Sequence, residues 1–265
     1  MYNLMGADLF KLRKSAAIKI LFGITALCAV AMTIMAYLIP QGKIDKSLTG
    51  VGFLFSDINV MGILGAVIAG VFICGDFDNK TIHDAIANGS GRLAVIVSKA
   101  AVFCAALAFI LLPYAVVTGV ALGTGYKFGM GSMAVGFLHL MVTEAGKAFS
   151  APEIGKLVAI MLTLIIVYAS QMSICVPLAF GMKKPVLVVA INYGLQILCG
   201  QLSAISANIP AFERVFACTP FGCIYKITSL DASAGDILSA IAVSLIFFVA
   251  MIAITYAVFR KSEIK

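Results

Sequence analysis

The chain has 265 residues, of which 62% are hydrophobic and 12% charged, with a formal net charge of +7. A soluble domain carries roughly 25% charged residues, so a water-soluble core cannot hold this much apolar surface. The composition excludes a soluble globular protein and predicts one membrane domain over residues 1–265. The basic residues lie at the ends of apolar runs, where they meet lipid headgroups, and this argues against nucleic acid as a partner.

Residues 1–19 are amphipathic and contain a basic cluster at residues 11–14. This pattern predicts a helix that lies along the membrane interface and contacts lipid. The next apolar run, residues 20–39, is too long for the apolar core of a signal peptide and long enough to cross a bilayer. We interpret it as the first membrane span, ended by Pro40.

Five further apolar runs are long enough to span the bilayer. They cover residues 51–74, 93–122, 157–180, 186–205 and 237–259, with Asn59 as an alternative start of the first. Pro113 predicts a kink within a continuous helix. The apolar stretch 133–141 has about half the length of a span and predicts an interfacial or re-entrant segment on the outer side. We therefore expect an all-α membrane protein with six transmembrane helices.

The distribution of Lys and Arg predicts the orientation of the chain. With the N-terminus inside, 12 of the 19 basic residues lie on the inner side and 7 on the outer side. Both termini are then cytoplasmic, the loop 206–235 is extracellular, and the chain is a multi-pass protein of the cytoplasmic membrane. Cys218 and Cys223 share this loop, and the sequence leaves a disulfide between them open.

The longest polar interruption on the inner side, residues 75–99, contains a helical pattern at residues 76–88. At about 100° per residue, apolar side chains fill one half of the helical wheel and polar ones the other, although Asp78 falls in the apolar half. The apolar half holds Phe77, Thr81, Ile82, Ala85 and Ile86, and the polar half holds Asp76, Asn79, Lys80, His83 and Asp84. The i,i+4 pairs Asp76–Lys80 and Lys80–Asp84 support this helix, and the glycines at 89 and 91 end it. We expect a short amphipathic helix that rests on the membrane or docks into a partner.

Uncharged polar residues mark two of the spans. Gln171 lies in the fourth span, and Asn192, Gln196 and Ser203 share one face of the fifth. Amide side chains are costly in lipid and face neighbouring helices or a wet cavity. Hydrogen bonding between helices is the simpler explanation, and a role in lining a substrate pathway is the alternative. No charged residue lies in mid-span, which argues against transport driven by protons or ions.

The three aspartates Asp76, Asp78 and Asp84 raise the alternative of an intramembrane transferase that holds Mg²⁺ and a diphosphate. Such a site needs a second acidic cluster facing the first. The other acidic pair, Asp231 and Asp236, falls on the opposite side of the membrane in the expected topology.

Other chemistry finds little support in the sequence. The glycines at residues 89–92 lack the spacing and the lysine of a phosphate-binding loop. His83 and His139 lie on opposite sides of the membrane, and neither has a second metal ligand at a suitable spacing. We therefore expect no catalytic residue, metal or cofactor in this chain. A non-catalytic membrane scaffold is a third alternative.

Three stretches resemble the membrane subunit of ABC-2 class ABC transporters. They are the basic end of the N-terminal helix at residues 10–15, the sequence Asp-Phe-Asp-Asn-Lys-Thr-Ile at 76–82, and the ending Phe-Arg-Lys-Ser-Glu-Ile at 259–264. The family usually has Glu where this chain has Asp76. The six-span arrangement covers the whole chain, and its compact size resembles permeases of lantibiotic and other peptide-antibiotic export or immunity systems.

The resemblance implies a role for each part of the chain. Residues 76–88 would be the coupling helix seated in an ATP-binding subunit, with residues 1–19 as the interfacial helix beside it. The expected contacts to that subunit are Asp76, Phe77, Thr81, Ile82 and Ile86. The loop 206–235 would form short broken helices, which Pro210 and Pro220 suit. ATP and Mg²⁺ would bind the partner, and a second permease, identical or related, would complete a pathway for a peptide-like or amphipathic substrate.

Overall fold

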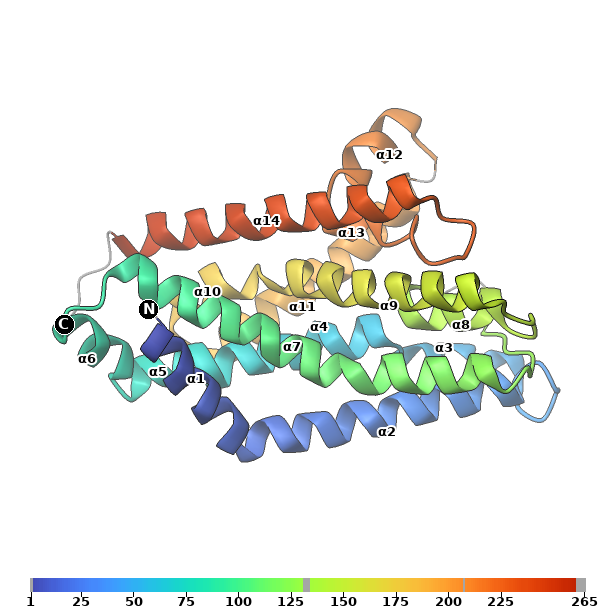
Figure 1. Ribbon diagram of the computed structural model, residues 1–265, viewed down its shortest axis with the longest axis horizontal. Helices are drawn as coiled ribbons and strands as arrows, with labels where there is room; N and C mark the ends of the chain where they lie inside the picture. The colour runs from blue at the N-terminus through green and yellow to red at the C-terminus, as the bar shows by residue number, and fades with distance from the viewer. Residues whose placement is uncertain (1, 131–133, 207, 261–265) are drawn as a thin grey trace.

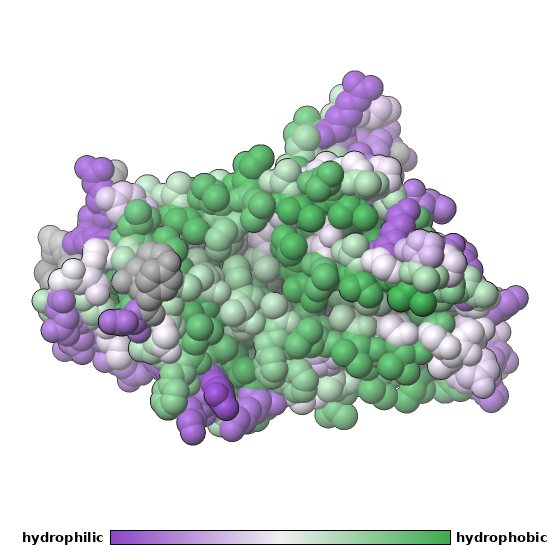
Figure 2. Space-filling view, viewed as in Figure 1, coloured by the Kyte–Doolittle hydropathy of each residue, from purple (hydrophilic) through white to green (hydrophobic). Residues whose placement is uncertain are grey.

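The computed structural model describes residues 2–130, 134–206 and 208–260, and the chain forms a bundle of helices along one long axis (Figure 1). Within these ranges, 6 helical segments are long and apolar enough to cross a membrane. They are Ala16–Leu38, Thr49–Asp78, Arg92–Gly123, Ala151–Met182, Pro185–Ser206 and Ala234–Arg260. Figure 2 shows a broad apolar band across one face of the bundle, with polar side chains gathered at its two ends. The chain is a multi-pass helical membrane protein, as its composition predicts.

Two of these segments consist of several helices. The second is divided into α3 (Thr49–Leu54), α4 (Asp57–Ala69), the π-helical turn η2 (Gly70–Cys74) and α5 (Gly75–Asp78). The fourth is divided into α9 (Ala151–Met172) and α10 (Cys175–Met182). The others are the single helices α2 (Ala16–Leu38), α7 (Arg92–Gly123), α11 (Pro185–Ser206) and α14 (Ala234–Arg260). Each segment contains nearly all of the apolar run predicted for it.

Short helices lie at both ends of the bundle (Figure 1). The terminal end, where α1 begins and α14 finishes, holds α1 (Tyr2–Lys14) and α6 (Thr81–Ala87). The opposite end, here named the loop end, holds the turn η1 (Lys46–Leu48), α8 (Gly136–Glu144) and α12 (Pro210–Ala217). With an even number of spans, the first and last helices of the bundle place their outer ends on the same side. The membrane side on which the terminal end lies stays a prediction.

The loop 206–235, apart from residue 207, contains the short broken helices that were expected. Pro210 and Pro220 occupy the first turns of α12 and α13 (Pro220–Cys223). Proline is favourable there because the first turn of a helix needs no N–H donor from that residue. Cys218 and Cys223 are both free thiols in this structure. Residues 261–264 of the family-like ending lie outside the described residues.

The half-length apolar stretch forms α8, which lies inside the bundle. Phe137, Leu138, Leu140 and Met141 are fully buried, and α8 packs against α2, α4, α7 and α9. An interfacial helix would leave one face to water or headgroups, whereas most of α8 is covered by other helices. Whether this segment is interfacial or re-entrant stays a prediction, and Met133 at its expected start lies outside the described residues.

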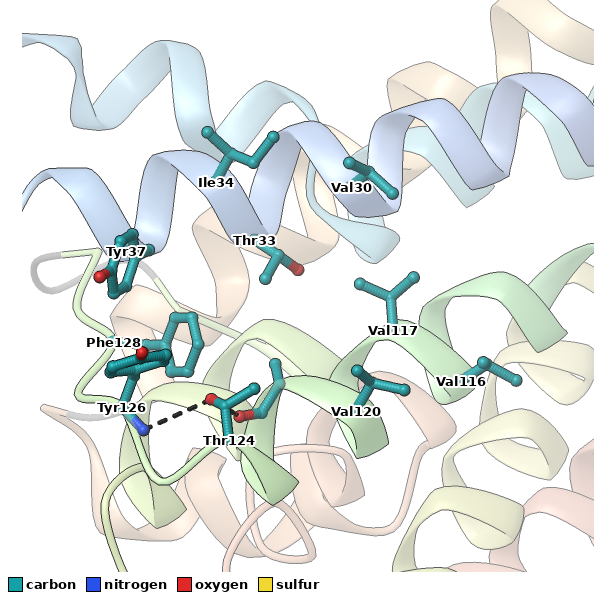
Figure 3. A pocket seen from close by; sticks show the side chains of 11 residues that line it. Val30, Thr33, Ile34, Tyr37, Val116, Val117, Val120, Thr124, Tyr126 and Phe128 are labelled. Carbon is teal, nitrogen blue, oxygen red and sulfur yellow. Dashed lines mark hydrogen bonds between the residues drawn. The ribbon is translucent and has the colours of Figure 1, made fainter.

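An apolar groove of about 470 Å³ runs between α2 and α7 (Figure 3). Its lining includes Val30, Ile34 and Tyr37 from α2, Val116, Val117 and Val120 from α7, and Tyr126 and Phe128 from the segment that follows. Almost all of this surface is apolar, so it is suited to contact the hydrocarbon of a bilayer. We name it the apolar groove.

Candidate functional site

The expected coupling helix at residues 76–88 is two helices joined by a turn. α5 continues from η2, and Lys80 then adopts a left-handed conformation with φ of 58° before α6 begins. A left-handed residue ends the helical hydrogen-bond ladder and redirects the chain. The extra residue of a π turn also rotates the following side chains by about 100° relative to α4. One helical wheel over 76–88 therefore does not describe both helices: Asp76 of its polar half is buried and Thr81 of its apolar half is exposed.

Asp76, which the wheel placed on the polar face, is buried in a group of charges. Its carboxylate accepts hydrogen bonds from the ammonium groups of Lys11 on α1 and Lys99 on α7. Lys99 also donates to Asp8 on α1 at 2.5 Å, and the hydroxyl of Ser98 donates to the other oxygen of Asp8 at 3.0 Å. Two negative and two positive charges thus compensate one another; Asp8, Asp76 and Lys99 are buried, whereas Lys11 is half-exposed. We name Asp8, Lys11, Asp76 and Lys99 the charge cluster; it joins α1, α5 and α7.

Phe77 belongs to an aromatic cluster with Phe180 of α10 and Phe259 of α14. Its ring centroid lies 5.3 Å from that of Phe180 and 6.0 Å from that of Phe259, and the rings meet edge to face. Arg92, the first residue of α7, donates to the carbonyl oxygens of Phe259 at 3.1 Å and Arg260 at 2.7 Å, which have no partner within α14. α5 is therefore held against α10 and α14 as well as against α1 and α7.

Three of the five residues expected to contact an ATPase are already buried in this chain. The exposed fractions of Asp76, Phe77 and Ile82 are 1%, 6% and 1%, so these side chains are not accessible to another protein. Ile86 is half-buried and Thr81 is exposed. In the α5–α6 unit (residues 75–87) the exposed residues are Asp78, Asn79, Lys80, Thr81, Asp84 and Ala87. Neither of the expected i,i+4 ion pairs is among the salt bridges of the described chain.

Asp57, which the sequence analysis passed over, is fully buried at the start of α4 and holds α8 in place. Its Oδ2 accepts hydrogen bonds from the backbone N–H of Phe137 at 2.9 Å and from the phenol of Tyr168, and its Oδ1 accepts from Leu138 N–H at 3.4 Å. The carboxylate thus satisfies N–H groups in the first turn of α8 and faces the positive end of its dipole. The sequence contains a signal of this role: Asp57 is a lone acidic residue in an apolar run, and such a residue needs partners in a membrane.

Tyr168→Phe is expected to lower stability without changing the fold. The substitution removes one donor to a buried carboxylate, and a buried acceptor that loses its partner costs about 1–3 kcal/mol. The measurement is the thermal unfolding midpoint in one detergent, with Tyr256→Phe on the exposed face of α14 as the control. Equal midpoints for the two variants would contradict the role of the Asp57 contact.

Glu144, at the end of α8, ties this helix to the loop 206–235. It is fully buried and accepts hydrogen bonds from the backbone N–H of Leu230 at 2.8 Å and from Lys147 at 2.7 Å. The hydrogen bond to Glu144 raises the pKa of the Lys147 ammonium above its usual value. His139 of α8 adds a second contact, with Nδ1 3.1 Å from the carbonyl oxygen of Thr228. The loop is therefore docked onto α8.

The four candidate pathway residues divide into two pairs. Gln171 donates to the carbonyl oxygen of Pro220 at 2.8 Å, and Asn192 donates to a backbone carbonyl of α4 at 2.8 Å. Both are buried, so their hydrogen bonds between elements match the simpler explanation. Gln196 and Ser203 instead line a cleft of about 550 Å³ between α4, α8 and α11 at the loop end. We name it the polar cleft.

The aspartates of the transferase alternative are not assembled into one site. Asp76 is paired with Lys11 and Lys99, whereas Asp78 and Asp84 lie on the surface. Throughout the part of the chain that the structure describes, no three His, Cys, Asp or Glu side chains form a group that could hold a metal ion. The positions of these aspartates give no support to the transferase alternative.

Two regions of the chain are therefore candidates for function. One is the α5–α6 unit at the terminal end, attached to the bundle by the charge and aromatic clusters. The other is the polar cleft at the loop end, with its uncharged lining.

Comparison with protein-family models gives no match, and no curated protein sequence matches this chain significantly.

Proposed function

We propose that this chain is the membrane-spanning permease subunit of an ABC transporter and moves a peptide-like or amphipathic substrate across the cytoplasmic membrane. In this proposal ATP and Mg²⁺ bind a separate ATPase subunit, and a second permease, identical or related, completes the pathway. Peptide-antibiotic export or self-immunity is the narrower form of the same proposal. The observation that carries it is the attachment of the α5–α6 unit to the membrane helices.

That attachment offers a route for force from a partner to the spans. α5 is continuous with α4 through η2, the charge cluster joins α5 to α1 and α7, and Phe77 joins it to α10 and α14. Closely packed side chains transmit a displacement because protein interiors are nearly incompressible. A partner that moves the α5–α6 unit would therefore move the spans as rigid bodies.

Charge reversal on the exposed surface of the unit tests the proposal. The variant Lys80→Glu with Asp84→Arg changes two exposed side chains, whereas substitutions at Phe77 or Ile82 would disturb the core and could not separate docking from folding. The tagged full chain is purified from its own host, and the co-purifying ATPase with a phosphate-binding loop is quantified by mass spectrometry. We expect that ATPase to fall at least about tenfold, because like charges at an interface oppose docking.

The control makes the same charge changes at the loop end, as Lys43→Glu with Asp231→Arg, and should keep its ATPase. Retention of a stoichiometric ATPase by the Lys80/Asp84 variant would exclude this docking surface. A complex of the unchanged chain without an ATPase, or ATP hydrolysis by the chain alone, would refute the permease role.

A further inference from the structure

The polar cleft differs from the apolar groove in its uncharged polar lining. It lies between the first half of α4, α8 and the second half of α11. The side chains with hydrogen-bonding groups are Asn59, His139, Tyr193, Gln196, Gln201, Ser203 and Tyr225. The lining residues include no Asp, Glu, Lys or Arg, and Phe53, Ile58 and Ile197 supply apolar contact.

Most of these polar groups have no protein partner within the described chain. The amides of Gln196 and Gln201 and the hydroxyls of Tyr193, Tyr225 and Ser203 make no hydrogen bond to a described residue. His139 uses Nδ1 on a loop carbonyl, which leaves Nε2 for another partner. Amide and hydroxyl groups gain free energy when they form hydrogen bonds. The free donors and acceptors of this cleft can therefore pair with water or with a hydrogen-bonding ligand.

The rest of the exposed surface shows that this polarity is local. The apolar groove of Figure 3 is of similar size, about 470 Å³ against about 550 Å³, yet its lining is almost wholly apolar. α11 and α14 are equally little covered by the rest of the chain, but α11 is the less apolar of the two. The low hydropathy of α11 reflects in part the residues that it contributes to the polar cleft.

We propose that the polar cleft binds an uncharged, amide-containing amphipathic ligand, namely a peptide segment with aliphatic side chains. Each of Gln196 and Gln201 offers both a donor and an acceptor, the pair that a peptide bond needs. The aromatic and aliphatic lining contacts the side chains of the ligand. A free carboxylate or ammonium would be desolvated here without a compensating charge. The volume lies within the range of about 300–1,000 Å³ typical of small-ligand sites.

The inference that this ligand is the transported substrate rests on the proposed permease function. Binding itself needs neither ATP nor a partner, so it is measured on the chain alone. A failure to find an ATPase therefore leaves the binding result standing, and a failure to bind leaves the ATPase result standing.

A tryptophan reporter makes binding measurable, because the chain contains no Trp. Ile197→Trp places the reporter in the polar cleft and Ile34→Trp places it in the apolar groove, and both isoleucines are 51% exposed. The full chain is placed in phosphatidylcholine nanodiscs and titrated with N-acetyl-leucyl-leucine amide. We expect a saturable change in tryptophan emission from Ile197→Trp and only the gradual change of lipid partitioning from Ile34→Trp.

Two comparisons define the ligand class and the residues. The same dipeptide with a free carboxylate or a free amine should bind at least about tenfold more weakly, because its charge loses water without gaining a partner. Adding Gln196→Leu and Gln201→Leu to the reporter chain should weaken binding of the capped dipeptide about tenfold, since two amide partners are lost. Gln41→Leu, at an exposed glutamine outside the cleft, is the matched control and should change nothing.

Each outcome decides for or against the proposal. Saturable binding that depends on the two glutamines and on the neutral ends of the dipeptide supports it. A response that never saturates, that is equal at both reporters, that ignores the charge of the dipeptide or that survives the double leucine variant overturns it. A response that never saturates would indicate that the cleft holds only water.

Discussion

Lys99→Met is expected to be the most destabilising single substitution in the charge cluster. The Lys99 side chain is 5% exposed and is the shared partner of Asp8 and Asp76, which are 8% and 1% exposed. Its removal leaves Asp8 with one hydroxyl donor and Asp76 with the half-exposed Lys11. Breaking a buried ion pair from one side costs about 3–5 kcal/mol because an uncompensated charge stays behind. The measurement is the thermal midpoint, followed by the fraction of protein that stays monodisperse after heating.

A double variant separates lost charge compensation from lost packing. Asp8→Asn with Lys99→Met removes one charge of each sign and leaves Asp76 paired with Lys11. We expect it to be more stable than Lys99→Met alone, because neighbouring substitutions in one network are not additive. Lys19→Met, on the exposed surface of α2, is the matched control. The interpretation fails if Lys99→Met is as stable as this control, or if the double variant is the least stable of the three.

Gly136→Ala is expected to displace α8 from the bundle. Gly136 has φ of +64°, and an added Cβ would lie 2.1 Å from Asp57 Oδ2 and 2.2 Å from the Tyr168 hydroxyl. The left-handed backbone costs alanine about 1–2 kcal/mol, and the overlap adds about 1–3 kcal/mol or more. Asp57 cannot move aside without releasing the N–H groups of Phe137 and Leu138. We expect a lower thermal midpoint and faster hydrogen exchange across α8.

Gly125→Ala separates the backbone effect from the overlap. Gly125 has φ of +70°, but an added Cβ would meet nothing within 4 Å. It should therefore lose only the backbone contribution, about 1–2 kcal/mol, and leave hydrogen exchange in α8 unchanged. If Gly136→Ala loses no more stability than Gly125→Ala, the close approach of Asp57 to α8 does not have the importance inferred here.

The behaviour of α5 and α6 shows why a helical wheel succeeds in one place and fails in another. A wheel assumes one uninterrupted α-helix. The left-handed Lys80 interrupts that regularity within residues 76–88, and the π turn η2 changes the side of α5 that faces the bundle. Phe77 and Ile82 were expected to face the membrane or a partner, but both are buried within this chain, as is Asp76 from the polar half. Neither the π turn at residues 70–74 nor the left-handed Lys80 is visible in the hydrophobic periodicity of the sequence.

Asp57 and Asp76 illustrate a second limit of the sequence analysis. Both are acidic residues close to apolar runs, and the sequence offers several bases and donors for each. Asp57 meets Tyr168, 111 positions away, and Asp76 meets Lys11 and Lys99, 65 and 23 positions away. A buried charge requires a partner, but the choice of partner is made when distant helices pack.

By itself, the sequence determined that this is a helical membrane protein with six spans, and it placed most of their boundaries. Those properties depend on the length and hydropathy of single segments, since each span must satisfy its own backbone hydrogen bonds in lipid. Only the tertiary structure decided that α8 is buried, that Asp76 and Phe77 point into the bundle, and that Gln171 and Asn192 bond between elements whereas Gln196 and Ser203 line a cleft. These outcomes depend on which surfaces of separate helices meet, and close packing of whole side chains, not local hydropathy, selects among them.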